Sequence, residues 1–142
     1  MAEIGGIGPR PPLIRRLMGP LRTPASGLAA QHRRIDAIAQ NIANAETTRT
    51  PDGGPYQRQV VALSPAPLGD GVRVAGIRQD AREGALVYDP GHPDADPSGY
   101  VRYPNVDVPA EMVDLMVARR AYEANVTVFQ VAKAMLRRAL DI

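Results

Sequence analysis

The chain has 142 residues, a formal net charge of +2 and no cysteine. This length suits one domain, and the missing cysteines exclude disulfide and thiolate chemistry. There is no tryptophan and one phenylalanine, Phe129, so the apolar residues are mainly Ala, Val, Leu, Ile and Met. Since such a chain has few bulky anchors for a compact core, we expect part of its burial to come from neighbouring subunits.

The first 22 residues are rich in proline and arginine. They lack the apolar segment and small-residue cleavage site of a secretory signal peptide, and no apolar run reaches the ~20 residues of a membrane helix. We predict a flexible leader over 1–22, because Pro20 and Pro24 would interrupt a helix that began earlier. The basic segment 10–34 also leaves open an adaptor that binds nucleic acid.

The first predicted helix covers 23–46, where Thr23 suits the N-cap and Pro24 the first helical position. Its apolar residues recur every seven positions, with one more between them, which indicates a coiled-coil-like seam made by Leu28, Ile35, Ile38 and Ile42.

Two asparagines, Asn41 and Asn44, lie near the end of this helix. They either bond across a helix interface and fix its register, or mark a surface position and the helix ending. The residues alone leave both interpretations open.

Residues 47–104 form a predicted β-rich or extended insert. Its first turn contains Gly53 and Gly54 but lacks the Lys-Ser/Thr pair of a phosphate loop, so it predicts a joint between helix and strand. The runs 56–63, 71–77 and 84–88 are typical of short strands. From Asp89 to Pro104 turn residues dominate, and no regular element is expected.

A metal site is the alternative for one part of this turn-rich stretch. Its carboxylate and imidazole groups are of the type that ligates metals: Asp89, His92, Asp94 and Asp96. The density of Asp and Pro favours consecutive turns, in which Asp side chains bond nearby amides. We therefore expect no metal and no cofactor. With no nucleophile motif in the chain, we also expect no catalytic residue.

The segment 105–142 belongs to the same helical domain and contains the second predicted helix, which starts at Pro109. Glu111 is placed favourably for the helix dipole. One heptad row contains Leu115, Tyr122, Phe129 and Leu136, and an adjacent row contains Met112, Val126 and Leu140. A further apolar stripe contains Val113, Val117, Ala121, Ala124, Val128, Val131 and Met135. One partner helix cannot cover all these faces, so this helix needs several neighbours.

Two long motifs carry a resemblance to a known family. The runs "NIANAETTRTPDGGPY" and "EMVDLMVARRAYEAN" resemble those of the rod, hook and hook-associated proteins of the bacterial flagellum. The run "DPGHPDADPSGYVRYPNV" narrows the resemblance to the protein C branch of the proximal rod. The resemblance covers residues 26–142; the leader before it departs from the family pattern.

The resemblance implies a mainly α fold, in which two long terminal helices pack as an antiparallel coiled-coil-like hairpin around a small insert. It implies a structural subunit of the hollow rod that crosses the periplasm and transmits torque. Expected partners are further copies, other proximal and distal rod proteins, the basal-body base and the flagellar type III export apparatus. Export without a cleaved signal peptide is also expected.

The residues expected to matter fall into two sets. The first is an assembly interface on the two helices: Leu28, Ile35, Ile38, Asn41, Ile42, Asn44, Met112, Leu115, Met116, Tyr122, Val126, Phe129, Val131, Leu136 and Leu140. The second is the joint after the first helix: Thr47, Thr48, Pro51, Asp52, Gly53, Gly54, Pro55 and Tyr56.

Overall fold

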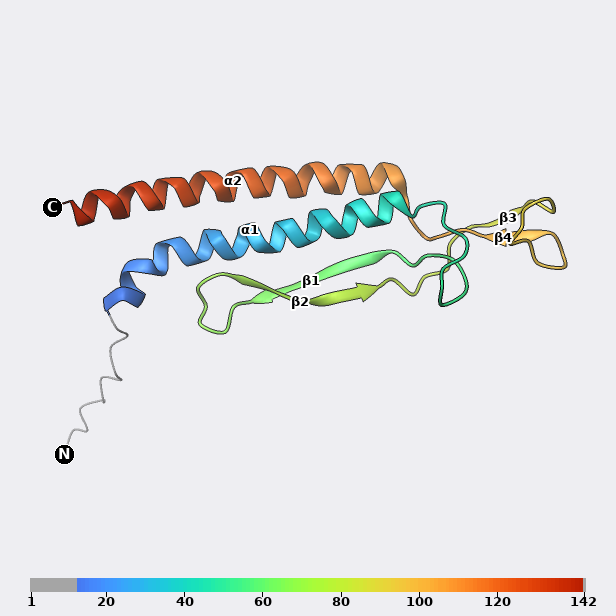
Figure 1. Ribbon diagram of the computed structural model, residues 1–142, viewed down its shortest axis with the longest axis horizontal. Helices are drawn as coiled ribbons and strands as arrows, with labels where there is room; N and C mark the ends of the chain where they lie inside the picture. Colours follow the sequence, from blue (N-terminus) through green and yellow to red (C-terminus); the bar gives the residue numbers. More distant parts are fainter. Residues whose placement is uncertain (1–12, 142) are drawn as a thin grey trace, which may run out of the picture.

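The computed structural model describes residues 13–141. It contains two long helices, α1 (Leu13–Ala43) and α2 (Val108–Leu140), with two small antiparallel sheets between them in sequence. In Figure 1 the helices lie side by side and run in opposite directions, and the β1–β2 hairpin lies along α1. The β3–β4 hairpin extends beyond the helices at one end of the molecule.

α1 begins ten residues earlier than the sequence indicated. The expected start at Thr23 is wrong: residues 13–22, assigned above to a flexible leader, are helical, and residues 1–12 lie outside the described part. Each proline removes one N–H bond and crowds the carbonyl four residues earlier, and a helix can accommodate both by bending. Figure 1 shows α1 bending in its N-terminal part, the part that contains Pro20. Pro24 is buried, so packing offsets the lost bond there.

α2 begins as its sequence predicts. Asp107 is the N-cap, its side chain accepts a hydrogen bond from the Ala110 amide at 3.3 Å, and Pro109 lies in the first turn. Arg137 and Arg138 lie in the last turn, where cations are favourable to the helix dipole.

The first sheet pairs β1 (Gln59–Pro65) with β2 (Val72–Gln79). Gln59 is opposite Gln79 and Pro65 is opposite Val72, with a bulge between Ala62 and Leu63. Because a two-stranded hairpin is marginally stable alone, its position depends on what it packs against.

The second sheet pairs β3 (Leu86–Tyr88) with β4 (Tyr100–Arg102). The expectation of no regular element in 89–104 is therefore wrong for Tyr100–Arg102. Val101 is buried, and the rings of Tyr88 and Tyr100 contact edge to face with centroids 5.1 Å apart. This cross-strand contact is not visible in the local composition.

Buried and partly buried residues of α2 recur in alternating four- and three-residue steps, in a row that includes Glu111 and Asn125, which contact Asn41 and Gly27 of α1. The members of this row are Glu111, Leu115, Ala118, Tyr122, Asn125, Phe129, Ala132 and Leu136. The heptad row of Leu115, Tyr122, Phe129 and Leu136 is part of it, and these four residues are partly buried. The helices approach closely at Gly27, where an added Cβ would lie 2.8 Å from the Asn125 side chain.

Candidate functional site: a buried polar network at the joint

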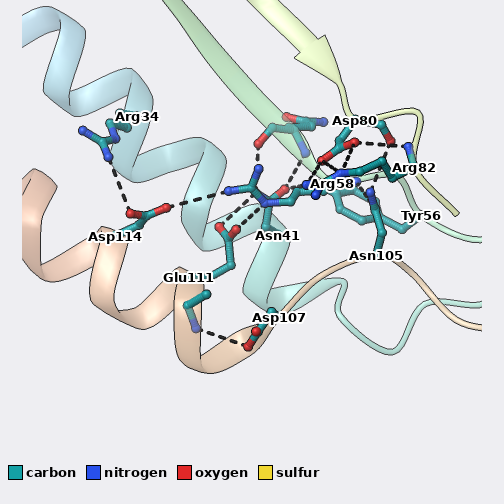
Figure 2. A network of polar contacts seen from close by, with 12 residues as sticks. Arg34, Asn41, Tyr56, Arg58, Asp80, Arg82, Asn105, Asp107, Glu111 and Asp114 are labelled. Carbon is teal, nitrogen blue, oxygen red and sulfur yellow. Dashed lines mark hydrogen bonds and ion pairs between the residues drawn. The ribbon is translucent and has the colours of Figure 1, made fainter. Parts of the chain in front are cut away.

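A network of polar side chains lies where the chain leaves α1 for the β1–β2 hairpin (Figure 2). Its two least exposed members are Asn41 on α1 and Glu111 on α2, with 0% and 1% of their surface exposed. Both occupy seam positions, where apolar residues would be expected. Buried polar groups are costly unless they are bonded, so their partners determine what the site does.

The Asn41 side chain bonds to three different segments. Its amide donates to Glu111 Oε2 at 3.0 Å and to the Gln59 carbonyl at 2.9 Å. Its oxygen accepts from the Tyr56 hydroxyl at 2.9 Å and from the Gln59 amide at 2.8 Å. Asn41 therefore fixes α2, β1 and the preceding turn against α1 through one side chain.

Arg58 supplies the cation of the network. Its Nε donates to Glu111 Oε1, and its guanidinium lies 3.7 Å from Asp114 Oδ2. The Arg58 amide donates to Asn105 Oδ1 at 3.1 Å, and its carbonyl accepts from the Asp80 amide at 2.8 Å. Arg58 thus connects the start of the hairpin, its end and the segment that enters α2.

Glu111 accepts one charge-assisted bond from Arg58 and one neutral bond from Asn41. A carboxylate buried in this way is stabilised only while both donors remain in place. Burial, and then the nearby Glu111 carboxylate, raise the pKa of Tyr56 above its ordinary value, so its hydroxyl stays a donor to Asn41.

Asp80 and Arg82 close the edge of the network on the solvent side. Bonds from the Arg82 side chain and then from the Arg82 amide lower the pKa of Asp80 to about 2. The same contacts raise the pKa of Arg82. Arg82 is exposed, so this pair tightens the turn after β2 more than it stabilises the fold.

The two asparagines have different roles. Asn41 bonds across the interface between α1 and α2, as one of the two interpretations required. Asn44 follows the other interpretation: its amide donates to the Gln40 carbonyl at 2.9 Å at the end of α1, and it accepts from Thr47 at 3.2 Å. The sequence alone does not distinguish Asn41 from Asn44, and their different roles follow from the tertiary structure.

The residues expected to form the joint lie in one turn. Gly53 and Gly54 have positive φ values of 85° and 74°, which favour glycine, and the Thr50 amide donates to the Gly54 carbonyl. Neighbouring Thr48 and Arg49 contact Asp94 at 2.7 and 2.8 Å, which connects this turn to the loop between β3 and β4.

The Asp-rich loop bonds mainly to itself. Asp89 accepts from the Gly91 amide at 3.2 Å, and Asp96 accepts from the Ser98 and Tyr100 amides at 2.8 and 2.9 Å. His92 Nδ1 accepts from the Asp94 amide at 3.0 Å. Within residues 13–141, no group of three or more His, Asp or Glu side chains is arranged to hold a metal ion.

The expected interface residues divide by exposure. Ile38 and Asn41 are buried by the chain's own elements and are not available to a neighbour. Partly buried ones are Leu28, Ile35, Ile42, Asn44, Leu115, Tyr122, Val126, Phe129 and Leu136. Exposed ones are Met112, Met116, Val131 and Leu140.

Sequence reasoning did not identify Arg58, Asn105 or Asp114, and it assigned Glu111 only a helix-dipole role. One signal was available for Glu111: it precedes Leu115 by four residues and so extends the apolar heptad row with a carboxylate. A charged residue at a seam position requires a buried partner. Its partner on the hairpin could not be identified from spacing, because Arg58 is 53 residues away.

A groove of about 330 Å³ lies between α1, β1 and the edge of α2. Its walls include Ile38 and Val61, and its rim holds Arg34 and Arg58 on either side of Asp114. Arg34 and Arg22, two cations of the segment considered for nucleic acid, pair with Asp114 at 3.7 Å and Asp70 at 3.0 Å. Both arginines therefore form ion pairs within the chain.

No helix in residues 13–141 combines the length and apolar character required to traverse a bilayer.

Family models and curated relatives that match this chain are all flagellar basal-body rod proteins. Residues 21–49 match the family described as flagella basal body rod protein, and residues 98–142 match the C-terminal family of flagellar basal body rod FlgEFG proteins. The flagellar basal-body rod protein FlgC of Borreliella burgdorferi is 45% identical, covering 89% of this chain and 97% of the relative. FlgC of Salmonella typhimurium is 42% identical (82% and 90% covered), and that of Bacillus subtilis is 41% identical (86% and 95% covered).

Proposed function

Because this chain belongs to the FlgC family of flagellar basal-body rod proteins, a family of structural subunits and not of enzymes, we propose that its polar network holds the hairpin rigidly on the helices so that the rod transmits torque. The single observation that carries this proposal is the contact of Asn41 with Glu111, Tyr56 and Gln59, which joins three segments at one buried point. A torque-bearing subunit must resist bending where its parts meet.

In this proposal the chain has three functional parts. The paired helices form an antiparallel coiled-coil-like inner domain, residues 47–104 form an outer insert, and Thr47 to Tyr56 are the joint between them. Support comes from the seam of alternating spacings between α1 and α2 and from the two bonds that connect the joint to Asp94.

The proposed place is the proximal rod within the periplasm. Its partners there are further copies of the chain, other rod proteins, the basal-body base and the export apparatus through which the subunit leaves the cytoplasm without a cleaved signal peptide. The apolar side chains left exposed along α2 support assembly with such neighbours. Nucleic-acid binding through 10–34 is not proposed, since Arg22 and Arg34 are already paired.

The test replaces the gene in a motile strain with variants that weaken the joint. Asn41→Ser with Tyr56→Phe removes the bond from the Tyr56 hydroxyl and shortens the side chain that reaches Glu111. We expect rods to assemble, with less torque delivered to a tethered load than in the wild type. The matched control, Asn44→Ser, alters a bond within the end of α1 and should leave torque unchanged. Equal torque from both variants would contradict the proposed rigid joint.

A further inference from the structure

The loop between β3 and β4 contains three turns of one kind, in which a side chain accepts a hydrogen bond from the backbone amide two residues later. Asp89 and Asp96 form the outer two, with bonds of 3.2 and 2.8 Å. In the middle turn, Nδ1 of His92 accepts from the Asp94 amide at 3.0 Å. Asp and Asn are the usual residues of such turns, so His92 is the exception in this loop.

The exception matters because of when each acceptor takes up a proton. A neutral imidazole accepts through its unprotonated nitrogen, but an imidazolium carries a hydrogen on both nitrogens and accepts no bond. Histidine ordinarily changes between these forms within about pH 8 to pH 5, a range in which aspartate normally stays ionised and remains an acceptor. Of the three turns, only the one at His92 therefore depends on pH across this range.

Asp94 makes the middle turn important, because its side chain connects the loop to the joint. The carboxylate accepts from the Thr48 hydroxyl at 2.7 Å and from Arg49 Nε at 2.8 Å, and the Asp94 side chain is only 17% exposed. Within the described part of the chain, these are the only hydrogen bonds or ion pairs between the joint, residues 47–56, and this loop. A change in the backbone that carries Asp94 is therefore transmitted directly to the joint.

The groups around His92 determine what its protonation does. The ring of Tyr103 lies edge to face with the imidazole, with centroids 6.3 Å apart, and the Asp89 carbonyl accepts from the His92 amide at 3.1 Å. The charged groups in its surroundings are Asp89, Asp94 and Asp96 on the loop and Arg49 on the joint. A positive imidazolium is attracted to the Asp94 carboxylate and so competes with Arg49 for it.

We propose that His92 is a pH-sensitive switch that controls the attachment of the loop between β3 and β4 to the joint. In its neutral form His92 holds the Asp94 amide, and the Asp94 carboxylate bonds to Thr48 and Arg49. A proton taken from solvent at Nδ1 replaces the acceptor with a donor, so the amide is released and the carboxylate turns from Arg49 toward the imidazolium. This switch goes beyond the proposed function, because it acts within the fold of the chain and does not depend on a place in the rod.

NMR of the isotope-labelled full chain between about pH 8 and pH 5 tests the switch. In the wild type we expect the amide resonances of Thr48, Arg49 and Asp94 to shift with the same midpoint as the imidazole of His92. The matched variant is His92→Asn, because the Asn side chain keeps an acceptor oxygen for the amide two residues later but takes up no proton. In this variant the three amide resonances should lose their shared transition.

His32→Asn is the control, since His32 is the only other histidine of the chain and lies on α1, where it pairs with Asp36 at 3.2 Å. Its removal should leave the transition at Thr48 and Arg49 unchanged. Thr48 and Arg49 resonances that do not follow His92 in the wild type would overturn the switch. A transition that persists in His92→Asn, or disappears in His32→Asn, would overturn it too. Each of these outcomes leaves the torque test of the joint unaffected, so the two proposals fail separately.

Discussion

Asn41 and Glu111, seventy residues apart in the sequence, are hydrogen-bonded at 3.0 Å in the least exposed part of the molecule. Glu111 belongs to a row of α2 residues that is otherwise mainly apolar or small, and Asn41 lies near the end of α1. A polar pair at such a position is costly in any other register, so it specifies how α1 and α2 align.

Replacing Asn41 with Ala should lower the free energy of unfolding by about 3 kcal/mol, because the Glu111 carboxylate and the Gln59 backbone groups lose buried partners. Denaturant unfolding of the purified chain, followed by circular dichroism, measures the change. Asn44→Ala is the control and should cost less than about 1 kcal/mol, since its bonds lie at the exposed helix end. Equal losses for the two variants would show that burial at Asn41 has no special energetic role.

Arg58→Leu should destabilise the chain by about 3–5 kcal/mol, because it leaves the carboxylate of Glu111 buried without its cation. The double variant Arg58→Leu with Glu111→Leu should recover most of this loss, since no buried charge then remains. A double-mutant cycle measured by denaturant unfolding gives the coupling. Additive losses would rule out a coupled pair.

Gly27→Leu should separate α1 from α2, because even a Cβ at this position lies 2.8 Å from the Asn125 side chain. We expect a loss of about 1–3 kcal/mol, typical of overpacking, and partial recovery when Asn125→Ala is added. Gly19→Ala is the control: nothing lies within 4 Å of an added Cβ there, so better helix propensity should raise stability by up to about 1 kcal/mol. Thermal unfolding of the four chains distinguishes steric overlap from propensity.

Alkaline pH should destabilise the joint through Tyr56. Its pKa is raised above 10.0 in the folded chain, so its contribution to stability is complete below pH 10 and is lost as pH rises through the folded value. Absorbance of the phenolate should show one tyrosine that ionises later than the others. Tyr56→Phe should remove that late step, and a late step that persists in this variant would assign it to another tyrosine.

Acid pH should act on the turn after β2 through Asp80. The pKa of this carboxyl is lowered from 3.8 to about 2 by Arg82, so its contribution is present above pH 3.8 and is lost as pH falls through 2. Carboxyl titration by NMR measures the value directly. Arg82→Ala should return the pKa of Asp80 toward 3.8, and no movement would show that the Arg82 bonds do not control it.

The sequence determined the features that depend on local spacing. Leu115, Tyr122, Phe129 and Leu136 are partly buried and share one row of α2 with Glu111, which bonds to Asn41 of α1. Asp107 with Pro109 begins that helix. The distribution of prolines correctly predicted an insert between two long helices. They misplaced the start of α1, because a proline within a helix can be offset by bending and by packing, as at Pro24.

Only the tertiary structure decided which polar residues become buried partners. Asn41, Arg58 and Glu111 come from α1, the segment before β1 and α2, and no local pattern indicates that they meet. β4 was missed for the same reason, since its three residues form a strand only opposite β3. Periodicity is a property of neighbouring residues, whereas hydrogen-bond partners and strand pairs are selected by the folded chain as a whole.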